Sequence, residues 1–200
     1  MEIDNRPVKW LHEPERHEEK NGRIILYTEP GTDFWQNTYY GVRKVNGHAL
    51  LMDTAEEEFS FSVKTTFASE SIYDQCGVMV YLDEENWCKA CVEYETEESQ
   101  KLGSVVTTLG FSDWASADIS GKVKRMYYRV SRRGNDYLIE NSTDGQNYHQ
   151  LRMFHLLGGN EKIGIGIFAC SPSEKGFKAV FEDFAIGGCV WPRAAEGQDA

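Results

Sequence analysis

The stretch from Asn86 to Glu95, NWCKACVEYE, holds the first candidates for chemistry. Cys88 and Cys91 form a Cys-x-x-Cys pair, which in other settings binds zinc or exchanges a disulfide. The stretch also alternates as a β-strand does, and two strand residues three positions apart point to opposite faces. Zinc would need two further ligands, and no second Cys or His pair has a suitable spacing. We therefore predict neither a metal site nor a cofactor.

As a strand, this stretch has two different faces. One face carries the apolar row Cys88, Ala90, Val92 and Tyr94, and the other carries Trp87, Lys89, Cys91 and Glu93. An aromatic platform beside charged groups is typical of a sugar-binding surface, because the ring stacks on the sugar and the charged groups bond its hydroxyls. The same face also fits a solvated strand with an ordinary ion pair, and both interpretations stay open.

Period-two alternation recurs along the chain, separated by Gly, Asn, Asp and Pro residues, and helix-period segments are nearly missing. Residues 59–67 alternate most regularly, and residues 76–95 predict a hairpin that turns at 83–86. Residues 124–154 predict three successive strands. In residues 162–170, glycines alternate with isoleucines, which suggests that something packs or binds close to the backbone.

These strands predict an all-β fold, a two-sheet antiparallel sandwich of about 12 to 15 strands. Hydrophobic residues make up 40% of the 200 positions, enough to bury a core without metals or disulfides. We expect a single domain over residues 1–190 and a flexible tail over residues 191–200.

The charge and the cysteines restrict the partners and the compartment. A formal net charge of -11 argues against nucleic acid and against an anionic membrane, since both need a basic surface. The first 20 residues lack the apolar region of a signal peptide, and no window approaches a membrane span. Five cysteines, an odd number, then favour reduced thiols and a cytoplasmic protein.

Several stretches together resemble a known family. They are WLHEP (10–14), TDFWQNTYYG (32–41), YDQCGVMV (73–80), NWCKACVE (86–93), SVVTTLGFSDW (104–114), STDGQNY (142–148) and FACSPSEKGFKAVFEDF (168–184). Their order and content resemble the YesU-like family of largely uncharacterised proteins, also called the regulation-of-enolase type. The resemblance implies a jelly roll of the concanavalin A-like lectin and glucanase type, also described as galectin-like. In that wider superfamily, carbohydrate is bound or cleaved on the concave sheet.

The resemblance also indicates which residues line such a sheet. Polar or aromatic residues match family motifs at Asp33, Trp35, Asp74, Gln75, Trp87, Lys89, Glu93, Thr107, Asp113, Trp114, Arg129, Arg152 and Ser171. The predicted ligand-binding residues are Asp74, Gln75, Trp87, Lys89, Glu93, Trp114, Arg129 and Arg152. Cys91 departs from the pattern, because a smaller residue such as glycine is expected there.

Each of these positions also has a structural interpretation. Asp74 and Asp113 could cap turns through hydrogen bonds from their side chains to the backbone. Trp114 could fix its loop, and Arg129 and Arg152 could join strands through a carboxylate.

Three functions remain open. The leading hypothesis is a lectin-like protein that binds an oligosaccharide or a sugar acid without catalysis, with Trp87 and Trp114 as stacking platforms. The second is a glycoside hydrolase or polysaccharide lyase that uses Glu93 with Asp74 or Asp113. The third is a regulatory module that acts on a metabolic enzyme through a protein interface. Sheet edges would also allow a homodimer.

Overall fold

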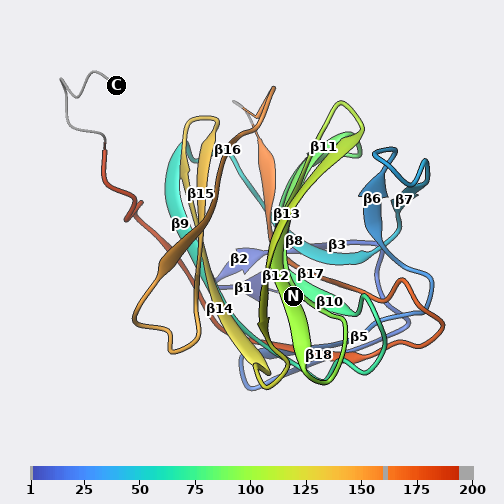
Figure 1. Cartoon of the computed structure of the whole chain (residues 1–200). Coiled ribbons are helices and arrows are strands. Elements are labelled where there is room, and N and C mark those ends of the chain that lie inside the picture. The colour runs from blue at the N-terminus through green and yellow to red at the C-terminus, as the bar shows by residue number, and fades with distance from the viewer. Residues whose placement is uncertain (1, 160–161, 194–200) are drawn as a thin grey trace.

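The computed structural model describes residues 2–159 and 162–193, which form β-strands and no helix (Figure 1). Accordingly, this part of the chain contains no helix long and apolar enough to cross a membrane. Of the predicted tail, residues 191–200, positions 194–200 lie outside the described residues.

Two antiparallel sheets of seven strands each form a sandwich. The front sheet has the order β13 (Phe111–Ser120), β12 (Ser99–Thr108), β11 (Asn86–Tyr94), β10 (Gln75–Asp83), β17 (Ile163–Cys170), β8 (His48–Thr54) and β3 (Lys9–Leu11). The back sheet has the order β16 (His149–His155), β15 (Asp136–Ser142), β14 (Arg125–Arg133), β9 (Glu58–Phe67), β18 (Lys178–Gly187), β5 (Arg23–Tyr27) and β4 (Arg16–Lys20). The predicted all-β sandwich is confirmed, and the strands of its two sheets fall within the expected number.

Two short ribbons complete the described chain. β1 (Glu2–Ile3) pairs with β2 (Arg6–Pro7), and β6 (Phe34–Gln36) pairs with β7 (Arg43–Val45). In Figure 1 the β6–β7 ribbon stands at the right, on the side of the front sheet that faces away from β9, β14 and β15. The outer face of the front sheet is therefore partly covered.

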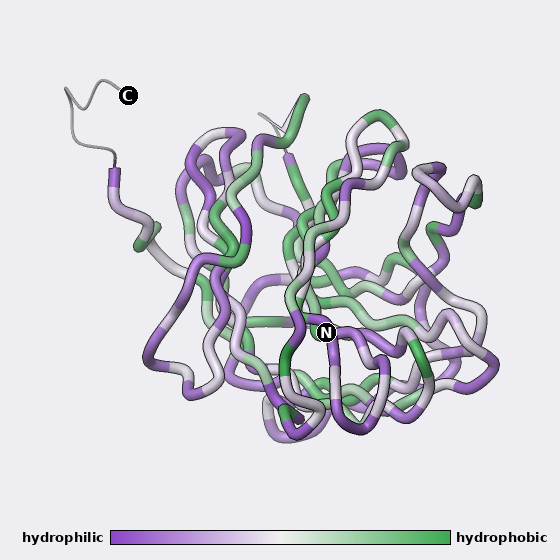
Figure 2. The backbone as a smooth tube through the Cα atoms, in the orientation of Figure 1, coloured by the Kyte–Doolittle hydropathy of each residue, from purple (hydrophilic) through white to green (hydrophobic). Residues whose placement is uncertain are grey.

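The main core lies between the two sheets. Phe59, Phe61 and Val63 of β9 point inward and are buried, as the alternation of residues 59–67 predicts. From the front sheet they meet Cys88 and Ala90 of β11, together with other inward residues. Hydropathy alternates along the strands accordingly (Figure 2). Full burial stabilises each large apolar side chain by about 1.5–3 kcal/mol, so this core holds the sheets together.

The glycines of β17 mark a close approach between strands. A Cβ atom on Gly166 would lie 2.1 Å from the carbonyl oxygen of Leu50 on β8. The sequence suggests that something lies close to this backbone, and the structure shows that the neighbouring strand does.

A second apolar cluster lies on the outer face of the front sheet, under the β6–β7 ribbon. It consists of Phe34, Ala49, Leu51, Met79, Trp87, Cys91, Val105, Phe168 and Cys170. Phe34 of β6 is fully buried and meets Trp87 and Phe168 edge to face, with ring centroids 5.7 and 6.1 Å apart. The front sheet is thus buried on both faces where the ribbon covers it.

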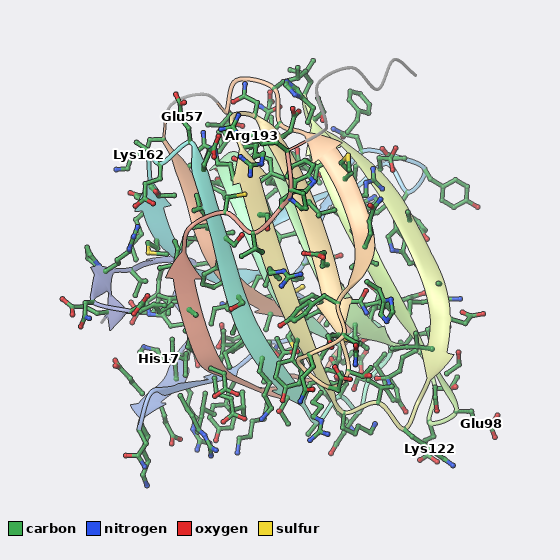
Figure 3. All side chains as sticks on the ribbon, turned by 90° about the vertical axis from the view of Figure 1, so that its left-hand side faces the viewer. His17, Glu57, Glu98, Lys122, Lys162 and Arg193 are labelled. Atoms are coloured by element: carbon green, nitrogen blue, oxygen red, sulfur yellow. The ribbon has the colours of Figure 1, made fainter. Side chains whose placement is uncertain are left out.

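Charged side chains lie at both ends of the sandwich. Figure 3 shows Glu57 and Arg193 at one end of the sandwich and Glu98 and Lys122 at the other.

Candidate functional site

The hairpin of β10 and β11 positions the centre of the site. Gln75 is paired with Glu93 and Met79 with Lys89, and Gly77 and Cys91 form a pair between them. Cys88 belongs to the core between the sheets and Cys91 to the outer cluster, so the two sulfurs of the Cys-x-x-Cys lie on opposite faces as predicted. Burial raises the pKa of the Cys91 thiol to about 12, which keeps it protonated and a poor nucleophile.

Four polar side chains form a connected network on the outer face of this hairpin. Lys89 Nζ donates to Gln75 Oε1 at 2.8 Å and lies 3.4 Å from Asp33 Oδ1. Gln75 Nε2 donates in turn to Glu93 Oε2 at 3.1 Å and to the carbonyl of Tyr73 at 3.2 Å. The order Asp33, Lys89, Gln75, Glu93 thus joins two carboxyl groups through a cation and an amide.

Lys89 is a buried cation held by its neighbours. It is only 2% exposed, and its Nζ lies 5.6 Å from the centroid of the Phe168 ring. Burial by itself lowers the pKa of Lys89, but Asp33 and other neighbouring groups raise it above the ordinary value. The ammonium group therefore stays charged at neutral pH.

Glu93 titrates in the neutral range. Burial raises its pKa, and although the Lys89 cation opposes this, the pKa lies at about 7 instead of the ordinary 4.5. Near neutral pH, Glu93 can therefore offer either a proton or a lone pair to a ligand. Strongly shifted carboxyls of this kind gather at functional sites.

The network forms the floor of a cavity of about 370 Å³, here called the front pocket. Its lining residues are Asp33, Trp35, Tyr40, Val42, Lys44, Tyr73, Gln75, Lys89, Glu93, Val105, Trp114 and Pro172. Aromatic rings from three separate segments surround a charged and hydrogen-bonding floor. A pocket of this size and composition is typical of sites for small polar ligands.

The loop before β6 brings Asp33 to this floor. The backbone N–H of Asp33 donates to Asn46 Oδ1 at 3.0 Å, and its carbonyl accepts from the N–H groups of Asn46 and Gly47. The backbone N–H of Phe34 donates to Asp33 Oδ1 at 2.7 Å. Asp33 is therefore fixed in position before any ligand arrives.

The structure brings four of the eight predicted ligand-binding residues together. Gln75, Lys89, Glu93 and Trp114 line the front pocket. Asp33 and Trp35, which match the family motifs, line it as well. The alternation of β11 thus predicts correctly that Lys89 and Glu93 share a face.

The other four residues lie elsewhere, each for a physical reason. Trp87 is on the predicted face, but the β6–β7 ribbon buries it completely, so it offers no ring face to a ligand. Asp74 is also fully buried; it accepts from Ser171 Oγ at 2.8 Å and from two backbone N–H groups of its own turn. Arg129 and Arg152 belong to the back sheet.

The two arginines join elements of the fold. Arg129 makes a paired contact with Glu140 at 2.7 and 2.9 Å and lies over the ring of Tyr148. Arg152 contacts Asp113 at 3.1 Å, which links β16 to β13. These are the strand-joining contacts that the sequence leaves open as an alternative.

The acid pairs expected for a hydrolase are not assembled. Asp74 is enclosed in its turn, as described above. Asp113 is paired with Val106, a residue of the inter-sheet core, whereas the pocket residue Trp114 is paired with Val105 on the outer face. Neither acid shares the front pocket with Glu93; the carboxyl group that does is Asp33.

Sequence reasoning missed Tyr40, Lys44, Tyr73 and Pro172. The sequence could have pointed to Tyr40, because two adjacent aromatic residues before Gly41 are unusual in an exposed hairpin turn. The contact of the β6–β7 ribbon with β11 brings distant segments together, and a single sequence does not show it.

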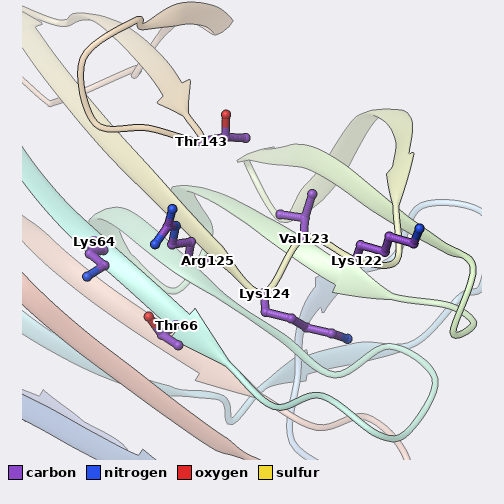
Figure 4. A pocket seen from close by; sticks show the side chains of 7 residues that line it. All are labelled: Lys64, Thr66, Lys122, Val123, Lys124, Arg125 and Thr143. Carbon is purple, nitrogen blue, oxygen red and sulfur yellow. The ribbon is translucent and has the colours of Figure 1, made fainter.

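A second cavity lies on the other side of the molecule. Figure 4 shows its lining, which is Lys64, Thr66, Lys122, Val123, Lys124, Arg125 and Thr143. Among these residues four are cations and none is aromatic or acidic, and Lys64 is already bonded to Glu182 at 2.6 Å. The front pocket is the better candidate, because its charged floor is partly buried and connected by hydrogen bonds. Within the described ranges, no three His, Cys, Asp or Glu side chains gather as a metal site would require.

Fold and site together define a two-sheet β-sandwich protein with a polar, aromatic-walled pocket on the outer face of one sheet. Residues 10–189 match the family described as "Protein of unknown function (DUF1349)", and the chain belongs to this family. The Saccharomyces cerevisiae protein named "Regulation of enolase protein 1" is 30% identical over 177 residues, which cover 88% of this chain and 87% of the relative. The resemblance to the regulation-of-enolase type is confirmed at this level.

Solved structures show the same fold. A crystal structure of a functionally unknown protein from Saccharomyces cerevisiae has a TM-score of 0.85 and 30% identity, covering 92% of this chain and 97% of that one. The GH43 protein BlXynB from Bacillus licheniformis has a TM-score of 0.69 at 17% identity. The match covers 92% of this chain and 37% of the BlXynB chain. At that identity the second likeness shows the fold alone.

Proposed function

We propose that this protein binds a carbohydrate in the front pocket and does not itself catalyse a reaction. The observation that carries the proposal is the partly buried network of Asp33, Lys89, Gln75 and Glu93 between aromatic walls. Sugar hydroxyls both donate and accept hydrogen bonds, and this floor offers an ammonium, an amide and two carboxyl groups. Exposed rings such as Trp114 offer flat faces on which a sugar ring stacks.

The state of Asp33 supports binding rather than catalysis. A glycosidase needs two carboxyl groups that are free to act as acid, base or nucleophile. Asp33 Oδ1 is held by the backbone N–H of Phe34 at 2.7 Å and faces the Lys89 ammonium at 3.4 Å. These contacts hold the Asp33 carboxyl group in place, so it is not free to act as acid, base or nucleophile.

Because it contains two cations, the pocket is suited to binding sugar acids as well as neutral oligosaccharides. Lys89 forms an ion pair with Asp33, whereas Lys44 Nζ makes only a long contact of 3.4 Å to the carbonyl of Gly31. Lys44 lines the pocket and could turn toward the carboxylate of a bound uronate.

The proposal is tested with a glycan array followed by calorimetry of the wild type and Trp114→Ala. Trp114 is 42% exposed, so the substitution should leave the fold intact while sugar affinity falls about tenfold, or about 1.4 kcal/mol. Met153→Ala is the matched control, because Met153 is an exposed apolar residue of β16 in the back sheet. If no neutral or acidic saccharide binds at millimolar concentration, the proposal is wrong.

We also propose that the protein is YesU-like and that its sandwich is a jelly roll of the concanavalin A-like type. We propose in addition that it is cytoplasmic and forms a homodimer through its sheet edges. Size-exclusion chromatography coupled to light scattering would test the dimer, which pairing along an edge strand such as β13 or β16 would form.

A second function is favoured by the name of the yeast relative. A protein that regulates enolase would make this chain a regulatory module acting on a metabolic enzyme through a protein surface. Calorimetry with purified enolase, with and without saccharide, separates the two functions. Binding to enolase with no response to any sugar would favour the regulatory function.

A further inference from the structure

A second hollow adjoins the front pocket, and we call it the aromatic hollow. It has a volume of about 570 Å³ and is lined by Trp35, Thr38, Tyr39, Tyr40, Phe111, Ser112, Asp113 and Trp114. Trp35, Tyr40 and Trp114 also line the front pocket. The two spaces therefore have three aromatic lining residues in common and lie side by side.

One wall of the aromatic hollow is a chain of three rings. The centroids of Trp35 and Tyr40 lie 5.5 Å apart with the planes at 69°, and those of Tyr40 and Tyr39 lie 5.0 Å apart at 83°. Tyr40 is 61% exposed and Tyr39 is 93% exposed. The chain thus leads from the pocket to the solvent, and burial of these two rings would remove a large apolar area from water.

The backbone holds this wall in a costly conformation. Tyr39 has a φ of 60°, in the left-handed region that a residue with a side chain rarely adopts. Such a conformation costs of the order of 1 kcal/mol and is found mainly at functional sites and ligand clamps. It is maintained by a tight turn in which Gly41 N donates to the carbonyl of Asn37 at 3.0 Å and Trp35 Nε1 donates to that of Thr38 at 3.0 Å.

The opposite wall is the beginning of β13, where Phe111 is 63% exposed. Hydrogen bonds fix the distance between the two walls. The backbone N–H of Gln36 donates to Ser112 Oγ at 2.9 Å, and Asn37 Nδ2 donates to the carbonyl of Gly110 at 2.7 Å. The hollow is therefore formed in advance, which lowers the entropic cost of ligand binding.

We propose that the aromatic hollow is a second sugar subsite, so that the ligand is an oligosaccharide with one unit in the front pocket and the next unit between Tyr39, Tyr40 and Phe111. This inference rests on the proposed function. The charged floor of the front pocket bonds the hydroxyls of one unit, and the rings of the hollow stack on the faces of the next. Its position beside the charged floor, with three lining residues in common, favours a ligand that fills both spaces over a protein that would cover the aromatic rim alone.

The test is calorimetry with three homologous series of one to three units: glucose to cellotriose, xylose to xylotriose, and glucuronic acid with its oligomers. In the series that binds, we expect the affinity to rise at least tenfold from one unit to two. Tyr39→Ala and Phe111→Ala should each remove most of this rise, because these two residues line the aromatic hollow and not the front pocket. Met153→Ala serves as the control, since its side chain is exposed on the back sheet.

The outcomes separate this inference from the proposed function. If one unit binds as tightly as two or three, or if the two variants keep the dependence on length, the second subsite is refuted while sugar binding stands. If no member of any series binds, both fail. Binding to enolase that Tyr39→Ala abolishes, with no effect of any saccharide, would overturn the subsite in favour of a protein interface.

Discussion

Replacement of Glu93 by glutamine isolates the energetic consequence of burying its carboxyl group. The pKa of Glu93 lies at about 7 in the folded protein, against an ordinary value of 4.5. Glutamine has nearly the same shape and does not ionise, and its carbonyl oxygen can still accept the hydrogen bond from Gln75 Nε2. The substitution therefore removes the titration and keeps the contact.

The magnitude follows from linkage between protonation and folding. Between pH 4.5 and 7 the folded state keeps the proton that the unfolded state has lost, so the free energy of unfolding falls as the pH rises. A pKa raised from 4.5 to about 7 corresponds to a loss of about 3 kcal/mol, complete above pH 7. Because Glu93 keeps some contact with water, we expect about 2–3 kcal/mol. Glu93→Gln lacks this loss, so its stability relative to the wild type should rise by that amount from pH 4.5 to pH 8.

Urea unfolding of both proteins at several values between pH 4.5 and 8 measures this difference. Glu98→Gln is the control, because it removes one negative charge from an exposed turn at the end of the sandwich (Figure 3). Its difference from the wild type should stay small throughout. A Glu93→Gln difference that stays constant within about 0.5 kcal/mol over the pH range would refute the buried, titrating carboxyl group.

Three further predictions concern the groups that hold the site. Lys89→Met should cost about 3–5 kcal/mol in urea unfolding, because it leaves the Asp33 carboxylate half-buried beside an apolar chain, and the double variant with Asp33→Asn should cost less than the sum of the two single changes. Gly77→Ala should cost about 1–3 kcal/mol, because the new Cβ would lie 1.9 Å from the carbonyl oxygen of Ala90; an unchanged melting temperature would contradict this close approach. Asp74→Ala should destabilise the fold by about 2–3 kcal/mol without changing the pH profile of sugar binding, since the Asp74 carboxyl group anchors its turn and does not itself line the pocket; calorimetry at pH 6 and 8 checks the second part.

The faces of the strands could be predicted because they depend on local alternation. The opposite directions of Cys88 and Cys91, and the shared face of Lys89 and Glu93, follow from the geometry of a single strand. The inward row of β9 follows in the same way. No partner has to be known for these predictions, because the side-chain period of two fixes them.

The exposure of each face could not be predicted in the same way. Trp87 and Glu93 share a face of β11, yet the first is buried and the second lines the pocket. The difference is made by Phe34, which packs on Trp87 from a ribbon 53 positions earlier in the chain. The pairing of Asp33 with Lys89 spans 56 positions and depends on the same ribbon. Contacts of this range follow from the tertiary fold.

The β6–β7 ribbon is anchored at one end and exposed to solvent at the other. Phe34 is wedged against Gly47, where even a Cβ atom would lie 2.4 Å from its ring, while Tyr39 and Tyr40 stand at the opposite end of the ribbon in the solvent. We therefore expect that turns of other length and composition at residues 38–42 would leave Phe34 in place. The ribbon would then serve as an exchangeable recognition loop on a constant scaffold, as the hypervariable loops of an antibody do.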